Sequence, residues 1–393
     1  MLHDLLKSSF KKSLFDLPEL KIGDFTARLP IIQGGMSVGI SLSNLASAVA
    51  NEGGIGVIGA AGIGMLEPDF NTNYRGANQR ALRREIRKAR SMTNGLIGVN
   101  ILAALSDFYE LVKVAVKEQI DFIFVGAGLP LKNLATIVGE SSDKIKTKLI
   151  PIVSSGRTTK VLFQYWAKHY GEVPDAVVVE GPKAGGHLGF KKEQIYDPNY
   201  KLENILPSVV ESVKPFERLF KKKIPVIAAG GIYTGYDIFK FMKLGASGVQ
   251  MATRFVATRE CDASPKFKEM YVKSKKEDIV IIDSPVGMPG RAIKNEFLKE
   301  VEMGDKKPFT CRFKCLKTCD YRTTPYCIAL ALTNAKLGKM LSGFAFAGEN
   351  AYRINKITTV KKLIRSLKKE YKRAVKYAAK KENSRVLHPN ISF

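Results

Sequence analysis

Residues Ile224–Phe255, IPVIAAGGIYTGYDIFKFMKLGASGVQMATRF, carry the pattern from which the fold of this 393-residue chain can be predicted. The stretch begins with an apolar run, Ile224–Ala228, continues with an amphipathic pattern at helical spacing, Tyr236–Lys243, and ends in a second apolar run, Ala246–Met251. Short runs that are apolar nearly throughout are typical of parallel strands buried on both faces. The stretch therefore predicts a strand–helix–strand unit.

The same alternation precedes this unit along the chain. Further strands are predicted at Pro30–Gly34, Gly54–Gly59, Leu96–Ile101, Asp121–Val125, Lys148–Val153 and Asp175–Val179. Further helices are predicted at Leu42–Glu52, Ala77–Ser91, Asp107–Glu118, Leu131–Ser141, Thr159–Tyr170, Leu206–Phe220 and Pro265–Lys273. Eight strands, each followed by a helix, predict an α/β protein with a closed (β/α)8 TIM barrel.

The alternation stops at about Val280, and the remainder has a mainly helical pattern with loops. We therefore expect an N-terminal extension at 1–28, a barrel at 29–278 and an added helical C-terminal region at 279–393 that folds over the barrel mouth or flank. Two long connections, Ala61–Gly76 and Pro182–Ile205, follow the ends of predicted strands, where barrel enzymes place their substrate loops.

The chain has no apolar stretch of the roughly eighteen residues that a membrane span requires. Its first twenty residues lack the continuous hydrophobic region of a signal peptide. We therefore expect a cytoplasmic protein with no membrane span.

The formal net charge of +26 includes one dense basic run, Lys361–Arg385. Apolar residues recur within this run at helical spacing, at Leu363, Leu367, Tyr371, Val375 and Ala378. The pattern predicts an amphipathic basic helix that docks one apolar stripe on the barrel. Binding of nucleic acid or an anionic membrane is the alternative, but no finger, RNP or helix-turn-helix signature supports nucleic acid.

Four of the five cysteines lie in one segment: Cys311, Cys315, Cys319 and Cys327. The odd total argues against a complete set of disulfides. The spacing would place the first three on one helical face, where a thiolate cluster site is conceivable. Zinc sites more often use C-x-x-C pairs, and no histidine is near. A turn of small hydrophobic residues is the favoured interpretation, and we expect no metal.

Glycine-rich or small-residue turns follow three predicted strands that would be neighbours around a closed barrel. The residues are Gly34, Gly35 and Met36 after the first strand, Gly230 and Gly231 after the seventh, and Gln250, Met251, Ala252 and Thr253 after the eighth. In barrels the last two strand ends commonly bind phosphate through backbone N–H groups at a helix N-terminus. An ordinary tight turn explains any one of these glycines, but three neighbouring turns favour a shared ligand-binding site, called the cradle below.

Two polar residues stand at other strand ends. His187 lies in the segment EGPKAGGHLG, Glu180–Gly189, which ends the sixth strand, and Gly185 and Gly186 beside it allow close approach. Imidazole is well suited to proton transfer near neutrality, whereas a loop histidine satisfied by backbone hydrogen bonds is the alternative. Asn100 ends the third strand, where its amide could bind a ligand or cap a helix.

The motifs PIIQGGM, EGPKAGGHLG, IPVIAAGGI and GVQMATRF, in this order, resemble those of the nitronate monooxygenases and of their relatives, the flavin-dependent enoyl-ACP reductases. The resemblance covers roughly Leu29 to Glu260. It implies FMN at the barrel mouth and places His187 on the family's catalytic histidine. The implied cofactor contacts are Gly34, Gly35, Met36, Asn100, Glu180, Gly185, Gly186, Gly230, Gly231, Gln250, Met251, Ala252 and Thr253. Glu180 stands where many nitronate monooxygenases carry Gln, and Ala252 where Gly is frequent.

The resemblance implies oxidation of alkyl nitronates, derived from nitroalkanes, by O2 to carbonyl compounds and nitrite. His187 would remove the α-proton of a nitroalkane or position a nitronate that is already ionised. The alternative is an NAD(P)H-dependent enoyl-ACP reductase, for which the basic surface would suit an acidic acyl carrier protein. A third hypothesis is a binding protein that uses the basic tail, with the barrel as scaffold. A homodimer is compatible with each of these.

Overall fold

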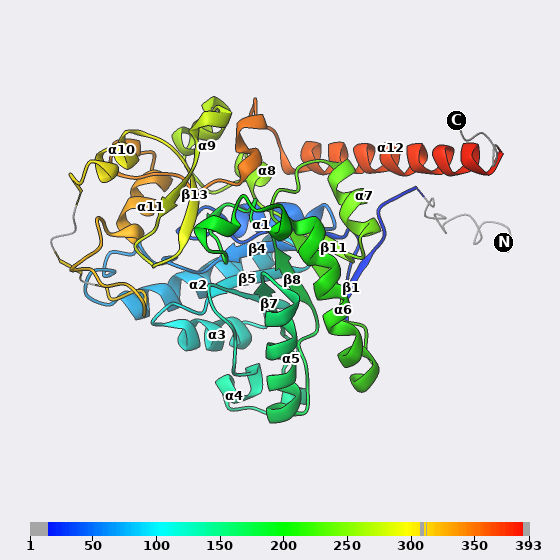
Figure 1. Cartoon of the computed structure of the whole chain (residues 1–393). Helices are drawn as coiled ribbons and strands as arrows, with labels where there is room; N and C mark the ends of the chain where they lie inside the picture. Colours follow the sequence, from blue (N-terminus) through cyan, green and yellow to red (C-terminus); the bar gives the residue numbers. More distant parts are fainter. Residues whose placement is uncertain (1–14, 307–309, 312, 388–393) are drawn as a thin grey trace, which may run out of the picture.

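The computed structural model describes residues 15–306, 310, 311 and 313–387 (Figure 1). Its main sheet contains β3 (Ile31–Gln33), β4 (Gly56–Gly59), β5 (Ile97–Leu102), β6 (Phe122–Gly126), β7 (Lys148–Val153), β8 (Val177–Glu180), β10 (Val226–Ala229) and β11 (Gly248–Met251). The eight strands are parallel in the order β3-β11-β10-β8-β7-β6-β5-β4. Ile55 N donates to Ile31 O at 3.0 Å and Gln33 N donates to Ile55 O at 2.9 Å, so β3 and β4 close the sheet. The predicted barrel is confirmed.

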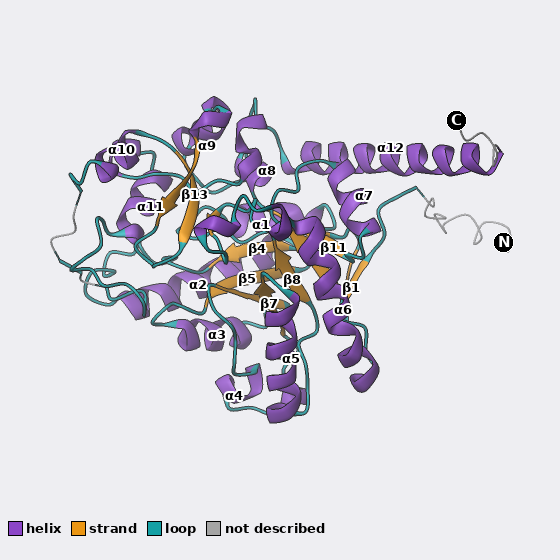
Figure 2. Ribbon diagram, viewed as in Figure 1, coloured by secondary structure: helices purple, strands orange, loops and turns teal. Residues whose placement is uncertain are grey.

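Helices surround the strands (Figure 2). They are α1 (Ser43–Asn51), α2 (Tyr74–Met92), α3 (Phe108–Lys117), α4 (Leu134–Val138), α5 (Gly156–Tyr170), α6 (Leu202–Phe220), α7 (Gly235–Lys243), α8 (Thr253–Val256) and α9 (Pro265–Lys273). All eight predicted helices are present; Pro265–Lys273 has the predicted ends, and the other seven differ at one end or both. α2 begins at Tyr74 because the Asn73 side chain accepts from Gly76 N and caps it. α4 is short because Gly139 ends it in the left-handed conformation, with φ of 80°.

A short antiparallel hairpin, β1 (Leu20–Ile22) and β2 (Phe25–Ala27), packs into the barrel core. Its apolar side chains join the buried cluster that fills the barrel interior, and Phe25 contacts Phe122 edge to face. Because Phe122 is the first residue of β6, the hairpin lies where the strands begin. The opposite end of the barrel, where the strands finish, is not covered by this hairpin and is the end at which a ligand could bind.

The C-terminal region contains α10 (Glu296–Glu302), α11 (Ile328–Lys336) and α12 (Val360–Leu387), which confirms its mainly helical character. It also contains a hairpin, β12 (Ile279–Asp283) and β13 (Pro289–Ile293), which the sequence pattern did not reveal. β13 pairs with the two-residue strand β9, Gly186–His187. A strand of two residues has no periodicity to detect. The division of the chain at 28 and 278 stays a prediction.

The basic helix α12 docks on the barrel as predicted. Leu363, Leu367 and Tyr371 are buried, and α12 packs against α7 and α1. Its later turns extend away from the barrel in Figure 1. None of the helices in the described part of the chain combines the length and the apolar character that a bilayer crossing requires.

The described residues of the cysteine segment form turns and loops, as the favoured interpretation expects, and the alternative of one helical face for Cys311, Cys315 and Cys319 was wrong. These residues lie in the connection between α10 and α11. Lys314 has a left-handed φ of 46°, which interrupts any helix between the first two cysteines. Residues 307–309 and 312 lie outside the described part of this connection.

Candidate active site

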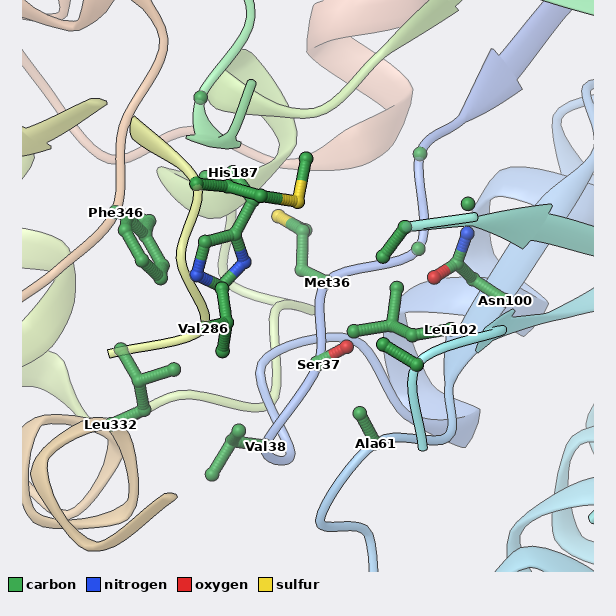
Figure 3. Close-up of a pocket in the computed structure, with 18 of the residues that line it drawn as sticks. Met36, Ser37, Val38, Ala61, Asn100, Leu102, His187, Val286, Leu332 and Phe346 are labelled. Atoms are coloured by element: carbon green, nitrogen blue, oxygen red, sulfur yellow. The ribbon is translucent and has the colours of Figure 1, made fainter. Parts of the chain in front are cut away.

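A cavity of about 720 Å³ opens at the carboxyl ends of the barrel strands (Figure 3). This volume is within the range of cofactor and substrate sites. A smaller cavity of about 70 Å³ adjoins it, and Glu180, Gly185 and Thr253 line both. Every candidate site residue from the sequence lines one of the two cavities. The fold therefore brings together residues from all the strand ends that the sequence singled out.

His187 presents its ring to the large cavity. Its backbone pairs with Gly290 of β13, and Phe346 contacts the imidazole edge to face with a centroid distance of 4.9 Å. Figure 3 shows the imidazole within the cavity, between Phe346 and Met36. Burial lowers the pKa of His187 to about 4, because the charged form loses its water. The imidazole is therefore neutral at neutral pH.

Ser284 fixes the orientation of this ring. Its Oγ lies 2.6 Å from His187 Nε2, and the same oxygen accepts from Val286 N at 3.5 Å. A hydroxyl that accepts from a backbone N–H keeps its own proton for another acceptor, which favours donation from Ser284 to Nε2. The proton of the neutral ring then resides on Nδ1. Nδ1–H is thus the group that can donate to a ligand.

Glu180 is a second titratable group at the junction of the two cavities. It is the last residue of β8, and burial raises the pKa of its carboxyl to about 7. A carboxyl that is half protonated near neutrality offers both a donor and an acceptor. In its protonated form Glu180 therefore offers one O–H donor and a carbonyl acceptor to a ligand at this junction.

The buried side-chain amide of Gln33 stabilises the turn that follows β3. Gln33 is completely buried; its Oε1 accepts from Val57 N at 3.0 Å and its Nε2 donates to Gly34 O. A Cβ on Gly35 would lie 2.4 Å from Asn100 Cβ. The lack of a side chain at Gly35 therefore lets the turn close onto Asn100, which points to the cavity in Figure 3. Sequence reasoning missed Gln33, although a polar residue inside a predicted buried strand was a signal.

The small cavity lies between the ends of β10 and β11. Gly230 and Gly231 have φ of 92° and 86°, which only glycine adopts readily. Asn350 Nδ2 donates to Gly231 O at 2.7 Å, and the short helix α8 begins at Thr253. Lys183 also lines the cavity and forms an ion pair with Glu349 at 3.1 Å. Loops, a helix start and a lysine together suit an anionic group.

The C-terminal region covers the large cavity with apolar side chains. They come from the β12–β13 turn, the cysteine loop, α11 and the segment before Ala347, and are Val286, Met288, Leu316, Leu332 and Phe346. The expectation that this region folds over the barrel mouth is confirmed. Sequence reasoning did not identify the individual residues, because they lie about a hundred or more positions away from His187 along the chain.

Arg291 joins this cover to the loop that carries His187. The side chain is only 2% exposed, and its Nη1 donates to Pro182 O at 2.5 Å and Ala184 O at 2.7 Å. Burial lowers the pKa of this guanidinium from its ordinary value. A buried guanidinium that satisfies two backbone carbonyls fixes the loop between β8 and β9.

Comparison with known sequences identifies relatives. The model of the nitronate monooxygenase family matches residues 19–370. A probable nitronate monooxygenase of Staphylococcus haemolyticus (strain JCSC1435) is 27% identical over 299 residues, covering 70% of this chain and 77% of the relative. One of Staphylococcus aureus (strain MSSA476) is 28% identical over 308 residues, covering 69% and 77%.

Solved structures agree on the fold. FabK from Thermotoga maritima superposes with a TM-score of 0.68 and 30% identity, covering 89% of this chain and 94% of that chain. A nitroalkane oxidase from Streptomyces ansochromogenes has a TM-score of 0.68 at 21% identity, covering 90% and 98%, and shows the fold alone. Since the family match spans most of its length, from the β1–β2 hairpin to α12, the chain belongs to the nitronate monooxygenase family and is an oxidoreductase.

Proposed function

We propose that this protein uses FMN to oxidise alkyl nitronates with O2, giving carbonyl compounds and nitrite. The observation that carries the proposal is the neutral, oriented imidazole of His187 facing an apolar cavity at the barrel mouth. The family match supports it, and so do the names of the two staphylococcal relatives, each a probable nitronate monooxygenase.

The two cavities suit the shape and charge of FMN. The small cavity, with Gly230, Gly231 and the start of α8, would hold the phosphate. The Gly34–Met36 turn and Asn100 line the large cavity, where the ring would bind. When bound, FMN supplies the redox chemistry that connects nitronate with O2. The specific assignment of FMN, like the role of each contact, is part of the proposal.

His187 would act as a hydrogen-bond donor to an anionic substrate. A base with a pKa of about 4 is too weak to remove a carbon-bound proton efficiently at neutral pH. Its Nδ1–H can instead stabilise negative charge on a nitronate oxygen. We therefore favour a nitronate that is already ionised over a neutral nitroalkane as the substrate of this site.

The apolar cover would hold the alkyl chain and exclude water. Val286, Leu332 and Phe346 line the side of the cavity opposite the strand tips. Side chains of this kind bind alkyl groups through burial, at roughly 25 cal/mol per Å² of apolar surface. Longer alkyl nitronates should consequently bind more tightly than nitroethane-derived nitronate until the cavity is filled.

Reduction of an enoyl thioester with NAD(P)H is a second candidate. The observation in its favour is the 30% identity with FabK over 89% of the chain, which exceeds the identity with the two staphylococcal relatives named probable nitronate monooxygenases. An acyl carrier protein would then be the partner of the basic surface. A cytoplasmic location and a homodimer stay predictions under both candidates.

Substrate tests separate the two functions. Oxygen uptake and nitrite release are measured with propyl nitronate, and NADH and NADPH oxidation with an enoyl thioester. Our proposal predicts nitrite formation with nitronate, and far slower reaction with the neutral nitroalkane at the same pH. Rapid oxidation of NADH or NADPH with the thioester, without nitrite formation from nitronate, would establish the second candidate instead.

A further inference from the structure

The exposed face of α12 carries a row of cations that the proposed function does not use. The helix has 28 residues, and a helix of this length is about 42 Å long. Six of its exposed side chains form what is called the cationic stripe below: Arg365, Lys368, Lys369, Arg373, Lys376 and Lys380. At about 100° per residue, the six positions fall within an arc of about 140°. They therefore share one continuous face of the helix.

The apolar face of α12 lies opposite the cationic stripe and is already occupied. Leu363, Leu367, Tyr371 and Ala374 are buried. Phe239 of α7 contacts Tyr371 edge to face, with a centroid distance of 6.0 Å. Because the apolar face docks on α7 and α1, the stripe is directed to solvent. Figure 1 shows the later turns of α12 extending beyond the barrel, where a large ligand can reach them.

No carboxylate neutralises the cationic stripe within the described structure. Glu370 is the one acidic residue between the first and last positions of the stripe, and its Oε2 accepts from Gly235 N at 2.8 Å, which directs this carboxylate towards α7. Lys372 pairs with Asp16 at 3.5 Å, but none of the six stripe cations forms an ion pair with a described residue. Like charges three and four positions apart on a helix repel each other. The stripe is therefore an uncompensated positive surface.

A second basic helix of the same chain has the opposite arrangement. Every arginine of α2 forms an ion pair with an acidic side chain. The pairs are Arg75–Glu110, Arg80–Asp69, Arg83–Glu118, Arg84–Glu67, Arg87–Glu118 and Arg90–Asp121. On α2 the fold thus supplies acids for the cations, whereas on α12 it supplies none for the stripe. The contrast favours a ligand of opposite charge on α12 over a face that is merely solvated.

The chemistry of the stripe favours a phosphate backbone over a bilayer. Helices that bind a bilayer surface bury an apolar face in it, but the barrel already covers the apolar face of α12. Tyr377 is the one large apolar side chain that is exposed on the described turns of the helix. A nucleic-acid backbone requires only cations. The major groove of duplex DNA is about 12 Å wide and admits an α-helix, and a stripe of this arc can reach the phosphates on both sides of the groove.

We propose that the cationic stripe of α12 binds the phosphate backbone of duplex DNA independently of base sequence. Lysine and arginine contacts to phosphate position a protein on the duplex without reading the bases. The inference goes beyond nitronate oxidation, because no residue of the stripe lines either cavity of the candidate active site. DNA binding and nitronate turnover can therefore be measured separately, and the failure of one does not imply the failure of the other.

The salt dependence of DNA binding tests the proposal. Fluorescence anisotropy of a labelled duplex of mixed sequence is measured with the full-length chain at several salt concentrations. Each phosphate contact releases condensed counterions, so the logarithm of the association constant should fall linearly with the logarithm of the salt concentration, with a slope of about −5 for six contacts. No binding at low salt, or a slope near zero, would overturn the proposal.

A triple variant locates the binding surface. Arg365→Gln, Lys369→Gln and Arg373→Gln together remove three stripe cations that lie one turn apart. We expect the slope to become shallower by about 3, and the affinity at about 0.1 M salt to fall at least tenfold. Nitronate turnover and thermal unfolding show whether the variant is folded. If the triple variant does not fold, the single change Lys369→Gln should still make the slope shallower by about 1.

A matched triple variant on α5 separates the stripe from the general charge of the chain. Arg157→Gln, Lys160→Gln and Lys168→Gln remove the same number of exposed cations from a helix that lies well apart from α12 in Figure 1. This variant should keep the affinity and the slope of the wild-type chain. An equal loss in the two triple variants would mean that the net charge of +26, and not the stripe, attracts DNA. Tighter binding to phosphatidylglycerol vesicles than to the duplex at the same salt concentration would overturn the choice of partner.

Discussion

At the scale of single residues, the environment of His187 determines what the site can do. The ring is neutral because it is buried, and it is oriented because Ser284 lies 2.6 Å from Nε2. An imidazole in water, with a pKa of about 6.5, is partly protonated near neutrality and has no fixed orientation. Both properties of His187 come from the β12–β13 hairpin and from Phe346, far away along the chain.

Replacing Ser284 tests this orientation. Ser284→Ala should lower kcat for propyl nitronate about tenfold, since one hydrogen bond of roughly 1.4 kcal/mol then no longer selects the tautomer. The flavin content should not change. Ser91→Ala, at an exposed site on α2, is the control. If Ser284→Ala retains full kcat and the pH profile of the wild-type chain, the hydroxyl does not position His187.

Because burial raises the pKa of Glu180, we predict that the stability of the folded chain depends on pH. Its folded pKa of about 7 lies above the ordinary pKa of a glutamate carboxyl, about 4.5, so the folded state resists ionisation between these values. The stability contributed by the protonated carboxyl is therefore present at low pH and is lost as the pH rises towards 7. Glu180→Gln should raise the melting temperature at pH 8 by clearly more than at pH 5. An equal effect at both pH values would show that this carboxyl is not perturbed.

At the scale of elements, the β12–β13 hairpin and α11 convert a barrel mouth into a covered cavity. The eight barrel strands could be predicted because parallel strands buried on both faces have continuous apolar runs. The hairpin could not, because β9 has two residues and pairs with a strand a hundred positions later. The spacing of the cysteines left a helical face open as an alternative, because spacing carries no information on the left-handed conformation of Lys314.

Arg291 connects these elements, and its removal should affect both stability and activity. Arg291→Met keeps the volume but leaves the carbonyls of Pro182 and Ala184 without a donor, at a cost of about 3 kcal/mol in the free energy of unfolding. Urea unfolding measures the loss, with the exposed Arg157→Met as control. The nitronate kcat of the folded variant should also fall, because the His187 loop is released. Unchanged unfolding and kcat would refute the connection.

Gly235 tests how α12 docks on α7. A Cβ at this position would lie 2.2 Å from Leu367 O and 2.4 Å from Tyr371 N. Gly235→Ala should therefore separate the two helices and lower the free energy of unfolding by about 2 kcal/mol. Tyr236→Ala, at the exposed neighbouring position, should have a much smaller effect. Similar stability of the two variants in thermal unfolding would mean that the helices adjust without strain.

At the scale of the whole molecule, the barrel gathers strand ends that are far apart in sequence into one site. Closure makes the tips of β3, β10 and β11 neighbours, which is why the glycine turns could be assigned to one cradle from sequence. The buried supports of this cradle, such as Gln33 and Arg291, depend on side-chain packing and were not predictable in that way. The C-terminal region adds the cover, the partner of His187 and the cysteine loop.

The visible spectrum of the purified full-length protein under anaerobic conditions, before and after addition of propyl nitronate or of NADH, tests the account most directly. We predict the absorption bands of an oxidised flavin, released as FMN on denaturation, and their bleaching by nitronate but not by NADH. A protein without flavin, or a flavin that NADH bleaches and nitronate leaves oxidised, would contradict the proposed site and its substrate.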